Sequence, residues 1–70
     1  MRPSSNYWEK PCAMPGLTSY RYAGYSGWIM IGAKDHADAL REATRSISSG
    51  DRAEMSRLQV WDGKGYVNAT

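Results

Sequence analysis

Alternating apolar and polar positions predict two strands in the first half of the chain. In residues 17–23, Tyr20 and Tyr22 occupy one face of a strand and Arg21 lies on the other. Residues 28–33 (WIMIGA) form the most apolar segment, which is too short for a helix and predicts a central strand buried on both faces. The glycine-containing cluster between the two segments predicts a hairpin loop.

A helical pattern follows over residues 34–50. Asp35 is a suitable N-cap, and Asp38, three residues later, resembles the second member of a capping box and adds negative charge to the first turn. Gly50 stands where a helix commonly ends. Helical spacing gives one apolar stripe, made of Ala39, Leu40, Ala43 and Ile47.

The last part of the chain predicts a second hairpin, with strands over residues 57–61 and 64–68. The Asp-Gly pair at 62–63 favours a two-residue type I′ turn. With the turn centred there, Val67 lies opposite Leu58. That register turns one apolar set toward the helix: Leu58, Val60 and Val67.

The element order predicts an α+β fold: a single β-β-α-β-β domain over residues 17–70, with one helix packed on a mostly antiparallel four-stranded sheet. Residues 1–16 contain three prolines and predict a flexible N-terminal arm. Tyr7 and Trp8 in that arm either fold back onto the domain or contact a partner.

Composition limits the classes of protein that fit. The chain has 70 residues, 41% of them hydrophobic, and a formal net charge of +2, which favours no class of partner strongly. Its one cysteine, Cys12, cannot form an intrachain disulfide, and no apolar run approaches a membrane helix. A cytoplasmic location is therefore expected.

Candidate catalytic and metal-binding groups are few. His36 is the only histidine, and Cys12 with His36 gives too few ligands for a metal site. Residues 27–34 superficially resemble a phosphate-binding loop, but an alanine separates the second glycine from the lysine. We therefore predict no cofactor, no metal and no enzymatic activity, with His36 as a solvated residue near a helix N-terminus.

The aromatic residues are the most informative set. On a sheet face they can anchor a protein partner or stack unpaired bases, and in a chain without Phe they must also supply core packing. Arg41 and Arg45 share a helix face, where Arg41 can equally pair with Asp38. The predicted partner-binding residues are Tyr20, Tyr22, Tyr25, Trp28, Arg41, Arg45, Trp61 and Tyr66.

The segment YRYAGYSGWIMIGAKDHADALREATRS, followed by SRLQVWDGKGYV, resembles small accessory proteins of phages and conjugative elements of Gram-negative bacteria. The resemblance implies a host-defence inhibitor of the anti-CRISPR kind. Such a protein would occupy a surface of a bacterial defence complex, such as a CRISPR effector, in the host cytoplasm. A small nucleic-acid-binding domain and a homodimer joined through a strand edge or the aromatic face are the alternative hypotheses.

Overall fold

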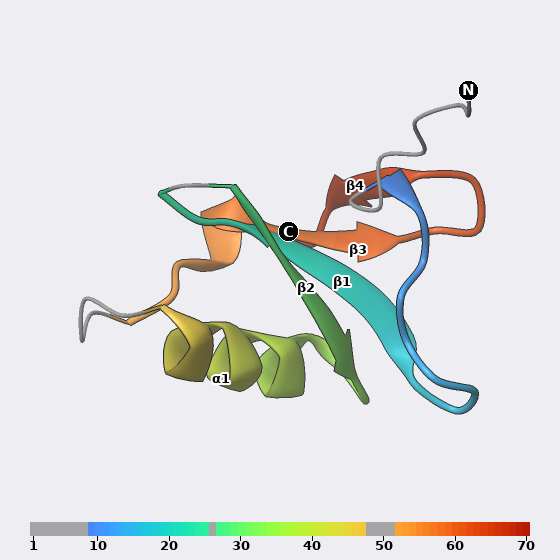
Figure 1. The fold of residues 1–70 in the computed structure, drawn as a ribbon, viewed down its shortest axis with the longest axis horizontal. Coiled ribbons are helices and arrows are strands. Elements are labelled where there is room, and N and C mark those ends of the chain that lie inside the picture. The colour runs from blue at the N-terminus through green and yellow to red at the C-terminus, as the bar shows by residue number, and fades with distance from the viewer. Residues whose placement is uncertain (1–8, 26, 48–51) are drawn as a thin grey trace, which may run out of the picture.

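The computed structural model describes residues 9–25, 27–47 and 52–70 (Figure 1). One α-helix packs on one face of a four-stranded sheet, as the sequence predicted. The elements follow the chain as β1 (Thr18–Ala23), β2 (Trp28–Ala33), α1 (His36–Ser46), the short 3₁₀ helix η2 (Met55–Arg57), β3 (Leu58–Trp61) and β4 (Tyr66–Asn68).

The sheet has the strand order β2-β1-β3-β4, and each neighbouring pair is antiparallel. Strands β2 and β3 therefore run parallel to each other with β1 between them, and α1 makes the connection from β2 to β3. In Figure 1 the helix lies below the sheet, alongside β2. Helix α1 covers one face of the sheet, and we call the opposite face the outer face (Figure 1).

Helix α1 begins at a well-formed cap. The Asp35 carboxylate accepts a hydrogen bond from the backbone N–H of Asp38 at 2.8 Å, and the Asp38 carboxylate accepts one from the N–H of Lys34 at 3.1 Å. The first bond satisfies a backbone donor that a helix start would leave unpaired, and the second ties the residue before the cap to the first turn. The backbone N–H of Lys34 holds the pKa of Asp38 below its ordinary value, and the Arg41 side chain adds to this effect.

The core lies between α1 and the sheet. Leu58 is fully buried, and Tyr20 and Tyr22 are only 2% and 3% exposed. Ala39 and Ala43 are the buried helix positions, and their small side chains let α1 approach the tyrosine rings closely. The predicted apolar stripe of α1 is thus confirmed, with Leu40 and Ile47 at its margins.

Both core tyrosines have hydrogen-bond partners for their hydroxyl groups. The Tyr20 hydroxyl lies 2.8 Å from Nδ1 of His36, and the Tyr22 hydroxyl accepts from the backbone N–H of Glu54 at 2.8 Å. Burial raises the pKa of Tyr20, and Asp35 and Asp38 raise it further. The tyrosines therefore bury their rings while satisfying one polar atom each, as a Phe-free core requires.

The second hairpin differs from its predicted register. Trp61 pairs with Tyr66, and Val60 with Val67, so Val67 does not lie opposite Leu58. The loop 62–65 is longer than a type I′ turn because the Asp62 carboxylate accepts from the N–H groups of both Lys64 and Gly65. The shift is two positions, so Val67 keeps the predicted face, although it is 44% exposed.

Two further predictions were wrong. Among the described residues, strand β2 pairs only with β1, so it is an edge strand and not a central one. It is also not buried on both faces, because Trp28 and Met30 on the outer face are half-buried and Gly32 is exposed. The helix ends at Ser46, before the predicted terminator Gly50, and Ile47 is extended with φ −84° and ψ 136°. Gly50 itself lies outside the described residues. The hydroxyls of Thr44 and Ser46 donate to carbonyls one turn earlier, and these side-chain bonds compete with continuation of the helix.

Residues 9–17 follow an irregular path beside the sheet, and this part of the predicted arm has specific contacts. The N–H groups of Cys12 and Ala13 both donate to the Ser19 hydroxyl, at 2.9 and 2.8 Å. Gly32 faces Ala13 so closely that a Cβ atom there would lie 3.2 Å from the alanine methyl group. Residues 1–8, with Tyr7 and Trp8, lie outside the described part of the chain.

Within the described residues, no helix has the length and apolar character needed to cross a membrane.

Candidate binding surfaces

The predicted partner-binding residues do not form one surface. Tyr20 and Tyr22 are buried between the sheet and α1, so they present almost no surface to a partner. Trp28, Trp61 and Tyr66 lie on the outer face. The remaining predicted residues lie elsewhere: Tyr25 in the loop after β1, and Arg41 and Arg45 on α1.

Arg21 is the centre of the outer face. Its guanidinium carbon lies 4.0 Å from the ring centroid of Trp28 and 4.6 Å from that of Tyr66. The Arg21 Nε donates to Oε1 of Gln59 at 2.7 Å. These contacts hold a cation against two aromatic rings that belong to strands on opposite edges of the sheet.

A polar row continues from Arg21 across the sheet. Arg21 pairs with Gln59, and Gln59 pairs with Asn68 in the strand register. The Gln59 side-chain amide uses both of its ends, accepting from Arg21 and donating from Nε2 to Oδ1 of Asn68 at 3.2 Å. The row is therefore pre-organised at its centre, because Arg21 and Asn68 on the two adjoining strands fix the orientation of the Gln59 amide.

Aromatic side chains flank this polar row. Trp61 and Tyr66 are cross-strand partners with ring centroids 5.2 Å apart and planes 68° apart, an edge-to-face arrangement. Arg21, Trp28, Gln59, Trp61 and Tyr66 are all half-buried, and we call these five residues the aromatic face. Each ring thus has part of its surface accessible and part fixed by contacts within the chain.

The segment before β1 closes one side of the aromatic face. The Tyr66 hydroxyl donates to the backbone carbonyl of Lys10 at 2.9 Å. Burial raises the pKa of Tyr66 to about 12, with the nearby Cys12 as a second cause, while Arg21 acts in the opposite direction. Tyr66 therefore stays protonated at neutral pH and keeps donating this bond.

A second surface lies on the helix side, where an open groove of about 560 Å³ runs between α1 and residues 52–53. Its floor is apolar and includes Leu40 and Ala53. Its rim carries Arg41, Arg45 and Arg52. Arg41 pairs with Asp38 at 3.0 Å and Arg45 with Glu42 at 2.6 Å, so the ion pair weighed for Arg41 from the sequence is present. Both arginine side chains are mostly exposed, and such pairs contribute little to stability.

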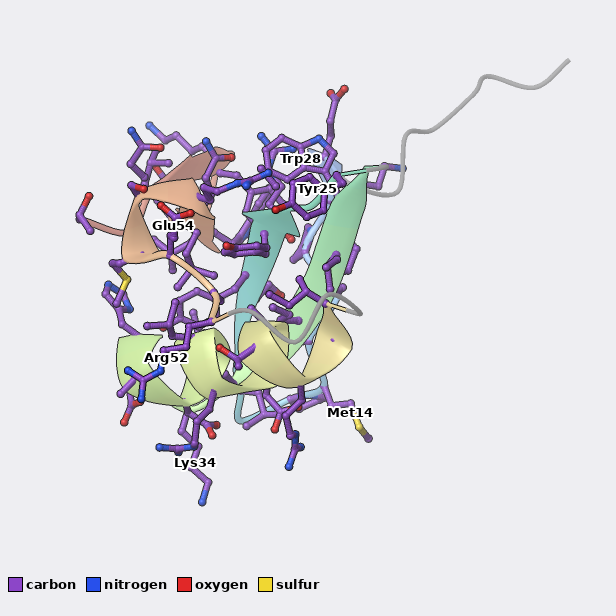
Figure 2. The ribbon with its side chains drawn as sticks, turned by 90° about the vertical axis from the view of Figure 1, so that its left-hand side faces the viewer. Met14, Tyr25, Trp28, Lys34, Arg52 and Glu54 are labelled. Carbon is purple, nitrogen blue, oxygen red and sulfur yellow. The ribbon has the colours of Figure 1, made fainter. Side chains whose placement is uncertain are left out.

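Tyr25 belongs neither to the aromatic face nor to the groove beside α1. It is 81% exposed, and the Arg57 guanidinium carbon lies 5.3 Å from its ring centroid and 5.7 Å from that of Tyr22. Tyr25 and Trp28 both appear near the top of Figure 2. Because Arg57 lies near both Tyr25 and the helix-side ring of Tyr22, the Tyr25 ring lies toward the helix side of the sheet, and Trp28 lies on the outer face.

The chemistry-bearing residues singled out in the sequence lie apart. His36 is exposed on the first turn of α1, and its Nδ1 shares a hydrogen bond with the Tyr20 hydroxyl in addition to its contact with solvent. The Cys12 thiol lies 3.5 Å from the Ile31 carbonyl. Within residues 9–25, 27–47 and 52–70, no three His, Cys, Asp or Glu side chains gather in a way that could hold a metal ion.

Sequence reasoning missed Arg21 and Gln59 as members of the aromatic face. A signal for Arg21 was present, because strand alternation already put it on the face opposite Tyr20 and Tyr22. Gln59 could not be assigned in the same way, because its partner Asn68 depends on the hairpin register. Comparison with protein-family models, curated proteins and solved structures finds no match for the chain.

Proposed function

We propose that the chain is a non-enzymatic binding protein that docks the aromatic face on a protein partner. The observation that carries the proposal is the stack of Arg21 between Trp28 and Tyr66, locked in place by Gln59. A surface of this kind needs only shape and fixed hydrogen-bonding groups, so a domain with a thin core can present it.

The residue types favour a protein partner. Trp, Tyr and Arg supply most of the binding energy in protein interfaces, particularly where a few of them cluster near the centre of a patch. The side chains of the aromatic face are already held by contacts with one another, so binding orders few of them further. Less entropy is then lost on association, which raises affinity for a given buried area.

The same contacts argue against stacking of nucleic-acid bases. One side of the Trp28 ring and one side of the Tyr66 ring are already occupied by the Arg21 guanidinium. A base would have to displace Arg21 or use the remaining ring surfaces. The nucleic-acid hypothesis therefore becomes an alternative outcome of the test.

The kind of partner comes from the sequence resemblance. Proteins of this size on phages and conjugative elements are often inhibitors of host defence, and the aromatic face is a surface suited to inhibition by occupying a partner's surface. The partner proposed on this ground is a bacterial defence complex, such as a CRISPR effector, encountered in the host cytoplasm.

The test is a titration of the chain against purified bacterial defence complexes, including CRISPR effectors, by calorimetry. Trp61→Ala removes an aromatic ring of the face, and Arg45→Ala on α1 is the matched control. We expect binding to at least one complex, weakened about tenfold or more by Trp61→Ala and unchanged by Arg45→Ala.

A parallel titration uses single-stranded DNA and RNA oligonucleotides at low and high salt. Oligonucleotide binding that weakens steeply with salt, together with no binding to the complexes, would replace the proposal with the nucleic-acid alternative. Equal losses from the Trp61 and Arg45 variants would contradict the assignment of the aromatic face as the docking surface.

A further inference from the structure

In the part of the chain that the structure describes, no strand pairs with the outer edge of β2. Strand β2 hydrogen-bonds to β1 on one side, and it is the first strand of the sheet order. The other edge of the sheet is β4, a strand of 3 residues, whereas β2 has 6. The longer free edge therefore offers the larger set of backbone groups.

The register shows which backbone groups face outward. Gly24 donates to the Gly27 carbonyl at 2.9 Å, which makes these two residues a hydrogen-bonded pair of the β1–β2 hairpin. Hydrogen-bonded pairs alternate along an antiparallel ladder, so Ile29, Ile31 and Ala33 direct their N–H and C=O groups toward β1. The N–H and C=O groups of Trp28, Met30 and Gly32 consequently point away from the sheet.

Nothing in the sequence of β2 protects this edge. Proteins commonly blunt a free strand with charged residues, proline or a bulge. The segment WIMIGA has no charged residue and no proline, and its pairing with β1 is continuous from Trp28 to Ala33. An edge with this composition is a template for another strand.

We propose that the β2 edge pairs with β2 of a second copy of the chain. In the antiparallel arrangement the two-fold axis passes midway between the two Met30 residues, so that Met30 of one copy lies opposite Met30 of the other. Trp28 then lies opposite Gly32 of the other copy, and Ile29 lies opposite Ile31. Each outward-pointing N–H acquires a carbonyl partner, and the two sheets of four strands become one continuous sheet.

The exposed apolar side chains support this occupant. Tyr25 lies at the end of β2 where the strand starts and is 81% exposed. Met14 and Leu17, which are 73% and 40% exposed, lie near the other end, where Leu17 approaches Gly32. In Figure 2 Tyr25 and Trp28 both lie near the top and Met14 lies far below them.

Antiparallel pairing brings these opposite ends together. The start of β2 in one copy meets the end of β2 in the other, so Trp28 of one chain comes beside Leu17 of the second on the outer side of the joined sheet. Leu17, which is 40% exposed in the single chain, is then covered at two symmetric places. A partner strand of unrelated sequence would have no such match to both ends.

This association shares Trp28 with the proposed docking surface, while Arg21, Gln59, Trp61 and Tyr66 lie on the strands away from the β2 edge. The two-fold axis runs perpendicular to the sheet, so both aromatic faces lie on the same side of the dimer. The backbone groups used are those of the β2 edge, and the rings and the Gln59 amide of the aromatic face keep the contacts they have in one copy.

The test is the mass of the full chain in solution, measured by sedimentation equilibrium from micromolar to millimolar concentration. Met30→Pro removes an outward N–H and leaves the β1 ladder intact, and proline is tolerated at such an edge position. Met30→Ala shortens the same side chain but keeps the N–H, so it is the matched control. We expect twice the 7.8 kDa chain mass for the wild type and Met30→Ala, and a dimer dissociation constant about tenfold or more higher for Met30→Pro.

Hydrogen exchange gives a second readout that does not depend on a variant. We expect the amides of Trp28, Met30 and Gly32 to exchange quickly at low concentration and to become protected as the dimer forms. A chain that remains monomeric at millimolar concentration would overturn the proposal. So would a dimer in which these three amides stay unprotected, because association would then use another surface. Neither result bears on whether the aromatic face binds a defence complex.

Discussion

The two faces of the sheet use the same residue types for different purposes. On the helix side, the rings of Tyr20 and Tyr22 are almost completely buried. On the outer side, Trp28 and Tyr66 are half-buried and both contact the Arg21 guanidinium. The comparison shows that alternation along the strand determines whether an aromatic side chain of this protein lies in the core or on the surface. The residue type alone does not determine it.

The polar atoms of the two faces differ in the same way. The Tyr20 and Tyr22 hydroxyls bond to groups that fasten α1 and the segment after it to the sheet. The Tyr66 hydroxyl bonds to Lys10, which belongs to the segment before β1. Changes on the helix side should therefore affect folding, whereas changes on the outer face should affect binding.

The largest effect is expected for Leu58→Ala. Leu58 is fully buried on the helix side, and deletion of such a side chain typically costs about 2–5 kcal/mol. The total free energy of unfolding of a domain this size is about 4–10 kcal/mol, so the variant should be partly unfolded at room temperature. Urea denaturation measures the change. Val67→Ala is the control on the same face, since Val67 is half exposed and should lose less than about 1 kcal/mol.

A smaller effect is expected for Tyr22→Phe. The substitution leaves the Glu54 N–H without the hydroxyl that accepts its bond, which should cost about 1–3 kcal/mol of unfolding free energy. Tyr66→Phe removes a solvent-accessible bond to Lys10 and should cost less. Equal losses for the two variants, measured by urea denaturation, would break the distinction between the faces.

Arg21→Met should have a modest effect on stability. It removes the stacked cation and the bond to Gln59, and we expect a loss of about 1 kcal/mol in the free energy of unfolding. Arg21→Lys keeps the charge but not the planar group, so it should recover only part of the loss. A loss as large as that of Leu58→Ala would show that the outer face is part of the core.

The smallest effect concerns the loop 62–65 and appears as a dependence on pH. The N–H groups of Lys64 and Gly65 hold the pKa of Asp62 below its ordinary value of 3.8. A folded-state pKa that is lower than the unfolded one gives stability above that ordinary value, and this stability is lost as the pH falls through the folded pKa. The difference in melting temperature between the wild type and Asp62→Ala should therefore shrink below about pH 4.

Asp62→Asn is the control for this pH dependence. Its side-chain oxygen can accept the same bonds without titrating. The melting temperature of Asp62→Asn should therefore follow that of Asp62→Ala in parallel through the acid range. A wild-type difference that is constant from pH 7 to strongly acidic conditions would show that the Asp62 charge does not contribute.

Local signals in the sequence were enough for the element order and the helix start. Alternation assigned Tyr20 and Arg21 to opposite faces, and the short spacing between Asp35 and Asp38 predicted the cap that the structure contains. The lateral order of the strands was harder to obtain. An apolar run such as 28–33 predicts a strand that is buried on both faces. The position of that strand in the sheet, however, depends on its contacts with segments that are distant in the sequence.

The candidate site was predicted only in part for the same reason. The sequence identified Trp28, Trp61 and Tyr66, but it did not separate them from Tyr20 and Tyr22, because the face covered by the helix is set by packing. The hairpin register was missed because an acceptor side chain, that of Asp62, lengthened the loop. The face assignment of the aromatic residues and the hairpin register were both missed because each depends on side-chain contacts that the alternation of residues along a strand does not predict.

The division of the sheet into a folding face and a binding face is tested most directly by hydroxyl-radical footprinting of the chain with and without its bound partner. The account predicts lower reactivity of Trp28, Trp61 and Tyr66 in the complex, with Leu40 on α1 unchanged. Loss of reactivity at Leu40, with Trp61 and Tyr66 unchanged, would contradict it.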